Sequence, residues 1–204
     1  MPACILNTRR RPIAGQEEAV LKRAIGHMEA HGRPGFVTTS LATLAGNGGY
    51  VTNTIQFESF DALAEVHDGI LSNESAQNRL AETASLCQSV ETNILERIKS
   101  VEDIPDGFVP KYMVRVIFTA KLGMTRQLIE ALLETRESNP GMKPAIFRPI
   151  SSAQRVRGTR VFAHLDDVRA ELARIQDRET PGKWVEFAQT AIRMVDRIHY
   201  RKRP

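Results

Sequence analysis

A weak internal repeat constrains the fold of this chain more than any other feature of its sequence. Three short landmarks recur in the same order at nearly one spacing, about 105 positions apart: FESFD at 57–61 and FAHLD at 162–166, Val90-Glu91 and Val195-Asp196, and Pro34-Gly35 and Pro140-Gly141. Because order and spacing are both kept, the sequence predicts a duplicated unit.

The stretch between the two halves is rich in residues that form turns. It contains Pro105, Asp106, Gly107 and Pro110, whose backbone angles are either fixed or permissive. A chain of 204 residues can hold two cores of about 100 residues each. We therefore predict a first unit over 1–104 and a second over 105–204.

Each half shows the same order of elements. The first half predicts a strand at 3–8, a helix at 16–31, hairpin strands at 36–44 and 50–57, helices at 60–71 and 74–86, and a strand at 89–98. The second predicts a strand at 111–119, a helix at 124–138, hairpin strands at 143–149 and 155–162, helices near 165–175 and 181–192, and a strand at 194–200. This order is βαββαβ twice, the pattern of the ferredoxin-like unit.

The first strand of the second half predicts how the two units associate. Its segment YMVRVIF, 112–118, is apolar on both alternations except for Arg115, so both faces of the strand are expected to be covered. The natural cover is the sheet of the other unit. The sequence therefore predicts an α+β fold of two tandem ferredoxin-like βαββαβ units whose antiparallel sheets pack into an α+β barrel.

Element order, length and the duplicated F-x-x-[FL]-D entry into a helix together resemble the dimeric α+β barrel superfamily. Within it, the chain is similar to the tandem NIPSNAP-like or EthD-like arrangement. The resemblance implies a cleft between sheet and helices in each unit. It also implies a range of activities, since the superfamily includes cofactor-independent monooxygenases, haem-binding and haem-degrading enzymes, isomerases, and proteins with no known reaction. It carries over no set of site residues.

His67 is the first candidate catalytic residue. In the helix 60–71 it lies between Leu63 and Leu71 on the helical wheel, on the same side as Phe60 and Ile70, so the pattern predicts that it faces inward. Its counterpart in the second half is Leu172. One interpretation is a core histidine that is hydrogen-bonded to a carbonyl or hydroxyl group. The other is a base or an axial metal ligand in a cleft of the first unit.

Two further polar residues are predicted on the helix-facing rows of the first unit. Asn53 alternates with Val51 and Ile55 and is a candidate catalytic residue that orients a substrate. Thr92 has the same position on the closing strand and is a candidate ligand contact. With His67, these groups could line a small-ligand cavity, or they could satisfy one another.

Tyr50 and Arg115 complete the candidate ligand-binding residues. Alternation places Tyr50 on the opposite face of its strand, towards the expected sheet interface, where hydroxyl pairing is the alternative role. In the hairpin of the second half, Arg155 and Arg157 share a strand face and could bind a carboxylate or phosphate, although such arginines more often decorate a solvated edge.

Metal and nucleic-acid binding are not predicted. His27 and His31 have a helical spacing that could present two imidazoles to a metal, but no further His/Cys cluster accompanies them, and their position near a helix C-terminus is an alternative explanation. The RNA-recognition module has the same element order, yet its basic and aromatic strand motif is absent and aromatic residues make up only 6% of the chain.

Charge and hydropathy limit the function classes further. The net charge of +4 is small and lies partly in the terminal strings RRR and RKR, and no run approaches the about 18 apolar residues of a membrane span. Cys4 and Cys87 are far apart, so reduced thiols and a cytoplasmic location are expected.

Two hypotheses on function remain. The first is a monooxygenase- or isomerase-like enzyme that acts on a small hydrophobic or aromatic molecule, with its cofactor left open. The second is a non-catalytic ligand-binding or assembly protein. A homodimer is compatible with both.

Overall fold

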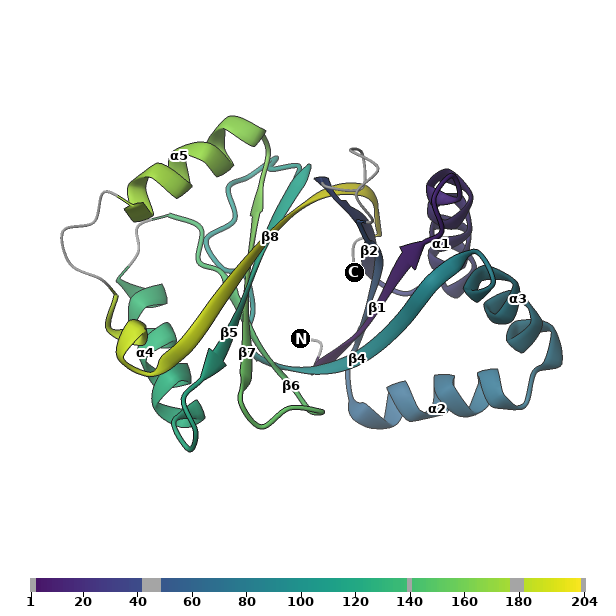
Figure 1. Cartoon of the computed structure of the whole chain (residues 1–204), viewed down its shortest axis with the longest axis horizontal. Coiled ribbons are helices and arrows are strands. Elements are labelled where there is room, and N and C mark those ends of the chain that lie inside the picture. Colours follow the sequence, from purple (N-terminus) through teal and green to yellow (C-terminus); the bar gives the residue numbers. More distant parts are fainter. Residues whose placement is uncertain (1–2, 42–48, 139–140, 177–181, 203–204) are drawn as a thin grey trace. The chain divides into compact units, whose positions relative to one another are not determined.

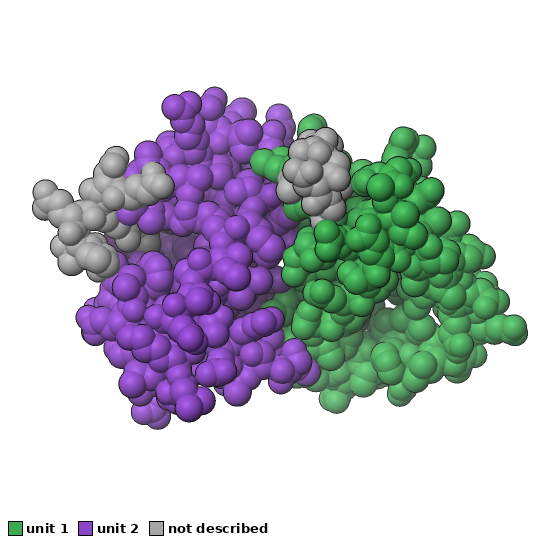
Figure 2. Space-filling view, in the orientation of Figure 1, with its two compact units in different colours: residues 1–96, 197–204 green, residues 97–196 purple. Residues whose placement is uncertain are grey.

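The computed structural model describes residues 3–41, 49–138, 141–176 and 182–202. They form two compact units, residues 1–96 with 197–204 and residues 97–196 (Figure 2). The elements are β1 (Cys4–Pro12), α1 (Glu17–His31), β2 (Gly35–Ser40), β3 (Val51–Phe57), α2 (Phe60–Leu71), α3 (Glu74–Ala84), β4 (Cys87–Lys99), β5 (Tyr112–Ala120), α4 (Thr125–Glu137), β6 (Ala145–Pro149), β7 (Arg155–Phe162), α5 (Leu165–Gln176), the 3₁₀ helix η2 (Lys183–Glu186) and β8 (Ala188–Lys202) (Figure 1).

In the first unit, β1 is the central strand and pairs antiparallel with both β3 and β4, while β2 pairs with the other side of β3. Helix α1 packs on this sheet, and it ends where Gly32 adopts a left-handed conformation with φ of 65°. Ser59 caps the N-terminus of helix α2, because its side chain accepts a hydrogen bond from the backbone N–H of Ala62. Apolar residues of β1, α1, β2, β3 and α2 fill the space between sheet and helices.

In the second unit, β7 lies between β5 and β6, again antiparallel. Helices α4 and α5 both contact β7 and cover one face of the sheet. The core is built around Phe118, Leu128, Leu132 and Ile146. Residues of both alternations of β5, Met113 and Arg115 on one face and Val114 and Phe118 on the other, are buried, as its apolar sequence predicts.

Strands β4 and β8 each contribute residues to both compact units. The hydrogen-bonded order of the described strands is β1-β3-β2-β8-β5-β7-β6-β4, and the pairing of β4 with β1 closes this order into an eight-stranded antiparallel barrel. The predicted α+β class with an antiparallel barrel is therefore confirmed.

The predicted helix at 181–192 is wrong. Residues 183–186 form a single 3₁₀ turn, and β8 begins already at Ala188. The end of the predicted strand 36–44 lies outside the described residues beyond position 41. In the described part of the chain, no helix is long and apolar enough to cross a membrane.

Candidate functional site

The second unit contains a cavity of about 610 Å³ between its sheet and its helices. This volume is in the range of about 300–1,000 Å³ that is typical of small-molecule sites. Its wall is mostly apolar, because rows of β5, β6 and β7 that face the helices meet the inner sides of α4 and α5. The side chains that define this wall are Val114, Val116, Phe118, Leu132, Ile146 and Leu172.

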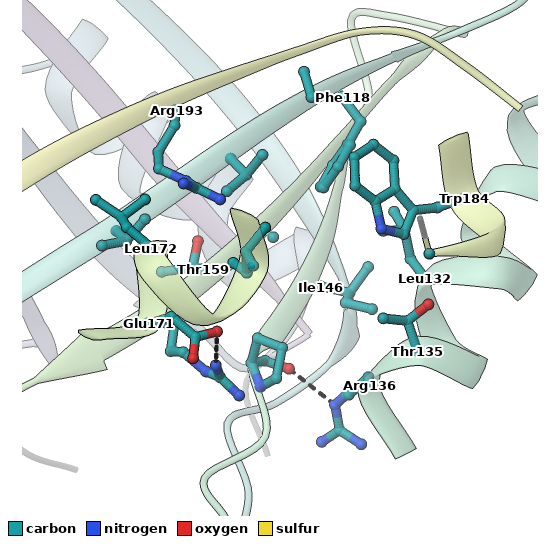
Figure 3. A pocket seen from close by; sticks show the side chains of 18 of the residues that line it. Phe118, Leu132, Thr135, Arg136, Ile146, Thr159, Glu171, Leu172, Trp184 and Arg193 are labelled. Carbon is teal, nitrogen blue, oxygen red and sulfur yellow. Dashed lines mark hydrogen bonds and ion pairs between the residues drawn. The ribbon is translucent and has the colours of Figure 1, made fainter. Parts of the chain in front are cut away.

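Two aromatic rings meet at one end of the cavity. The rings of Phe118 on β5 and Trp184 on η2 pack edge to face, with centroids 5.1 Å apart and planes at 67° (Figure 3). Gly182 permits this arrangement, since a Cβ atom at that position would lie 2.5 Å from Nε1 of Trp184. The 3₁₀ turn thus presents a large flat apolar surface to the cavity.

Charged side chains in the cavity wall are predominantly positive. Arg136, Arg160, Arg174 and Arg193 line it together with a single carboxylate, Glu171. Glu171 is paired with Arg160, and both oxygen atoms of the same carboxylate accept hydrogen bonds from Arg174 at 3.0 Å. One carboxylate therefore binds two guanidinium groups, and the charged side chains of the wall retain a net positive charge.

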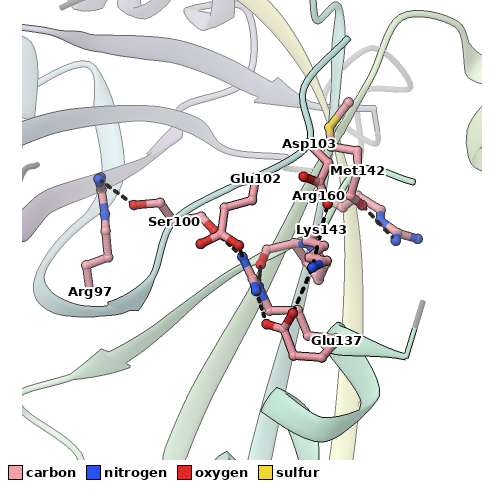
Figure 4. A network of polar contacts seen from close by, with 10 residues as sticks. Arg97, Ser100, Glu102, Asp103, Glu137, Met142, Lys143 and Arg160 are labelled. Carbon is pink, nitrogen blue, oxygen red and sulfur yellow. Dashed lines mark hydrogen bonds and ion pairs between the residues drawn. The ribbon is translucent and has the colours of Figure 1, made fainter. Parts of the chain in front are cut away.

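A polar network adjoins the cavity and fixes two of its arginines (Figure 4). Arg136 is buried, pairs with Glu102 at 2.8 Å, and donates to the backbone oxygens of Ser100 and Pro144 at 2.9 Å each. Arg160 donates to the carbonyl of Met142 at 3.0 Å. These contacts link the segment after β4 to the end of α4, so this side of the cavity is held by directed hydrogen bonds.

Haem binding, which the resemblance implies for some members of the superfamily, requires an axial ligand such as His, Cys, Met or Tyr. The described residues that line the cavity include none of these types. This donor set does not fit a haem. In the described residues as a whole, no group of three or more His, Cys, Asp and Glu side chains could hold a metal ion.

Comparison with known proteins supports the fold. No family model and no curated protein matches the sequence. Among solved structures, the chain is similar to an anthrone oxidase-like protein, with a TM-score of 0.70, 13% identity, and 98% of this chain and 92% of that chain covered. It is also similar to a candidate monooxygenase from Fusobacterium nucleatum, with a TM-score of 0.66, 10% identity and coverage of 98% and 94%.

A third similar structure is a chlorite dismutase variant from Candidatus Nitrospira defluvii, with a TM-score of 0.58, 6% identity and coverage of 98% and 92%. At such identities the likeness shows the fold alone. The three structures therefore support the α+β fold with an antiparallel barrel.

The predicted inward position of His67 is wrong. Its side chain is 68% exposed, and its Nδ1 lies 3.8 Å from the carboxylate of Asp68. The prediction treated Phe60 and Leu71 as core residues, but both are exposed. The buried stripe of α2 is instead centred between Leu63 and Val66, so His67 falls outside it.

Asn53 does lie on the helix-facing side of the first unit, as predicted. Its amide nitrogen donates to the carbonyl of Ala24 on α1 at 2.9 Å, and its amide oxygen accepts from Arg10 at 2.6 Å. Burial lowers the pKa of Arg10 and is also the main cause of a lowered pKa at His27, to which the charge of Arg10 adds. The amide is thus occupied by structural partners.

The other candidates of the first unit do not gather around Asn53. Thr92 is exposed, and its hydroxyl lies 3.4 Å from that of Thr8 on β1. Tyr50 is half-buried under the guanidinium of Arg9, 3.9 Å from the ring centroid. The structure therefore does not bring His67, Asn53 and Thr92 together around one cavity, and their roles in catalysis or binding stay hypotheses.

Arg115 is buried but faces away from the cavity. Val114 and Val116, its neighbours on β5, line the cavity, so alternation directs Arg115 to the opposite face. There its Nη1 lies 3.2 Å from Oδ2 of Asp196 on β8. A ligand-binding role for Arg115 also stays a hypothesis.

Most residues of the cavity were not predicted from the sequence, although the sequence contains indications for two of them. Leu172 was identified only as the apolar counterpart of His67, yet it is the member of that pair that lines a cavity. Arg160 belongs to the basic hairpin that was considered for anion binding, but on the face opposite to Arg155 and Arg157. Trp184 falls within the predicted helix 181–192, so its position in the 3₁₀ turn before β8 was not predicted.

Proposed function

We propose that this chain is a small-molecule-binding enzyme of the dimeric α+β barrel type, which oxidises an electron-rich aromatic compound with molecular oxygen. The observation that carries the proposal is the cavity of about 610 Å³ between the sheet and helices of the second unit, with its apolar wall and its Phe118–Trp184 pair. The similar structures described as anthrone oxidase-like and as a candidate monooxygenase suggest the substrate and reaction.

An anthrone-type substrate supplies the electrons for this reaction itself. Loss of a proton from its methylene carbon gives a delocalised enolate, which can transfer electrons to oxygen. One oxygen atom becomes the new carbonyl, and the other leaves as water with the two hydrogens of the methylene group. The chain contributes an apolar surface for the rings and a positive excess from Arg160, Arg174 and Arg193, which favours the anionic form of the substrate.

The proposal includes a tandem arrangement of ferredoxin-like units over 1–104 and 105–204, of the NIPSNAP-like or EthD-like kind. Two observations support it. Each half has the element order βαββαβ, with an additional helix in the first half and a 3₁₀ turn in the second. The strand orders β4-β1-β3-β2 and β8-β5-β7-β6 place corresponding strands at corresponding positions.

A non-catalytic ligand-binding protein is the second candidate, and one observation favours it. Among the described cavity residues, Glu171 is the only side chain that could act as a general base near neutral pH, and two arginines already bind it. In that case the cavity would hold an aromatic molecule without changing it.

Oxygen uptake with anthrone, together with the appearance of anthraquinone, tests the first candidate. We expect both above the rate of uncatalysed autoxidation with the unaltered protein. Leu172→Trp should reduce oxygen uptake and anthraquinone formation to the uncatalysed rate, because the indole would occupy the cavity. A matched control is Leu122→Trp, since Leu122 is 87% exposed and does not line the cavity.

Equal rates for Leu172→Trp and the unaltered protein would place the reaction elsewhere and overturn the proposed site. The non-catalytic candidate would be favoured if the unaltered protein binds anthrone without oxygen uptake and Leu172→Trp abolishes this binding.

A further inference from the structure

Arg193 differs from the other arginines of the cavity wall. It lies on β8, its side chain is exposed, and it extends towards the space beside Leu172 (Figure 3). Within the described residues it has no hydrogen bond and no ion pair, and its guanidinium is available to a ligand.

The remaining arginines are already held by the protein. Arg136 binds the carboxylates of Glu102 and Glu137 and two backbone carbonyls. Arg160 and Arg174 share Glu171. A ligand anion near these groups would compete with a protein carboxylate, whereas an anion at Arg193 would compete with no side chain among the described residues.

We propose that the cavity takes aromatic carboxylic acids, and that Arg193 is the specificity-determining residue that binds the carboxylate. The ring system would lie against the apolar wall of Leu172, Phe118 and Trp184, with the acidic group directed to the solvent-facing end of the cavity. This inference shares the cavity with the proposed function, but it concerns binding and does not require that the ligand is converted.

The charge and shape of the site favour a carboxylate. One planar guanidinium can donate two parallel hydrogen bonds to one carboxylate, and the single charges cancel. A doubly charged phosphate would need a second cation directly beside Arg193, whereas Arg160 and Arg174 already bind Glu171. A neutral aromatic molecule would gain no charge pairing from Arg193.

Trp184 provides a direct reporter, because it is the only tryptophan of the sequence and lines the cavity. The experiment compares 2-naphthoate with the neutral 2-naphthalenemethanol by calorimetric titration, with Trp184 fluorescence as a second readout. For the unaltered protein we expect naphthoate to bind about tenfold more tightly than the alcohol.

Three substitutions separate the role of Arg193 from general electrostatics. Arg193→Gln should weaken naphthoate binding about tenfold and leave the alcohol unchanged, and Arg193→Lys should retain part of the preference. The matched control is Arg169→Gln, which removes an equal charge from an exposed position of α5 that does not line the cavity. It should leave both affinities unchanged.

The inference is overturned if the unaltered protein does not bind naphthoate, if it does not prefer naphthoate to the alcohol, or if Arg193→Gln and Arg169→Gln bind naphthoate equally well. These outcomes are distinct from failure of the proposed function. If naphthoate binding depends on Arg193 but no oxygen is taken up, the inference is supported and the proposed function is not. If oxygen is taken up equally with acidic and neutral aromatic compounds, the proposed function is supported and the inference is not.

Discussion

At the scale of single residues, the buried charge of Arg10 explains why an asparagine is found in the middle of β3. Arg10 is almost fully buried, and burying a guanidinium without a hydrogen-bond acceptor is costly. Asn53 accepts from Arg10 with its oxygen and donates to the carbonyl of Ala24 with its nitrogen. A single amide therefore satisfies a cation and attaches the sheet to α1.

The first prediction concerns this amide. Asn53→Leu should lower the free energy of unfolding by about 2–3 kcal/mol, because the buried guanidinium of Arg10 loses its acceptor and Ala24 loses its donor. Thr92→Val, on β4 of the same sheet, is the matched control and should change the free energy of unfolding by less than about 0.5 kcal/mol, since Thr92 is exposed. Urea denaturation measures both. A change of similar size in the two variants would show that the Asn53 contacts do not stabilise the first unit.

The contrast between Asn53 and His67 shows which orientations can be predicted from sequence. In a strand, side chains alternate strictly, so the apolar neighbours Val51 and Ile55 were sufficient to place Asn53. In a short helix, the direction of the buried face depends on which apolar residues are counted. Phe60 and Leu71 are exposed in α2, and including them displaced the predicted stripe towards His67.

At the scale of elements, the segment from η2 into β8 determines one end of the cavity. The sequence predicted a helix at 181–192 and a strand at 194–200, but β8 already begins at Ala188, so residues 188–192 of the predicted helix belong to the strand. The packing of the 3₁₀ turn against Phe118 depends on contacts distant in sequence and could not be predicted from a local pattern.

The second prediction tests the close approach of backbone and indole in this turn. Gly182→Ala should displace the Trp184 ring, because the new Cβ atom would lie within 3 Å of it. The emission of Trp184 should change, and binding of aromatic compounds in the cavity should weaken. Gly69→Ala is the control, since a Cβ atom there meets nothing within 4 Å and Gly69 lies in α2 of the first unit. Identical emission in both variants and the unaltered protein would contradict the assigned turn.

At the scale of the whole molecule, the two halves share an element order, but their cores are packed from different side chains. Both halves share the βαββαβ order, yet the cavity described here lies in the second unit, whereas the sequence placed the candidate cleft in the first. In the first unit, residues of α1, α2 and the sheet form a continuous core around Phe57 and Met28. The volume left between sheet and helices depends on how the side chains pack, and this packing cannot be predicted from the sequence pattern.

The third prediction follows from the contribution of β8 to both compact units. Its residues 197–202 belong to the first compact unit, where His199 Nε2 lies 2.8 Å from the hydroxyl of Thr39 on β2 and Tyr200 packs against the core. Deleting residues 197–204 should therefore leave β2 without its neighbour β8, since β2 otherwise pairs only with β3. Hydrogen exchange should show lost protection in β2, while β5 and β7, which pair with each other in the second unit, remain protected. Deletion of residues 203–204 alone is the control and should leave β2 protected. An equal loss of protection in β2 and β7 would mean that the two compact units unfold as one cooperative structure.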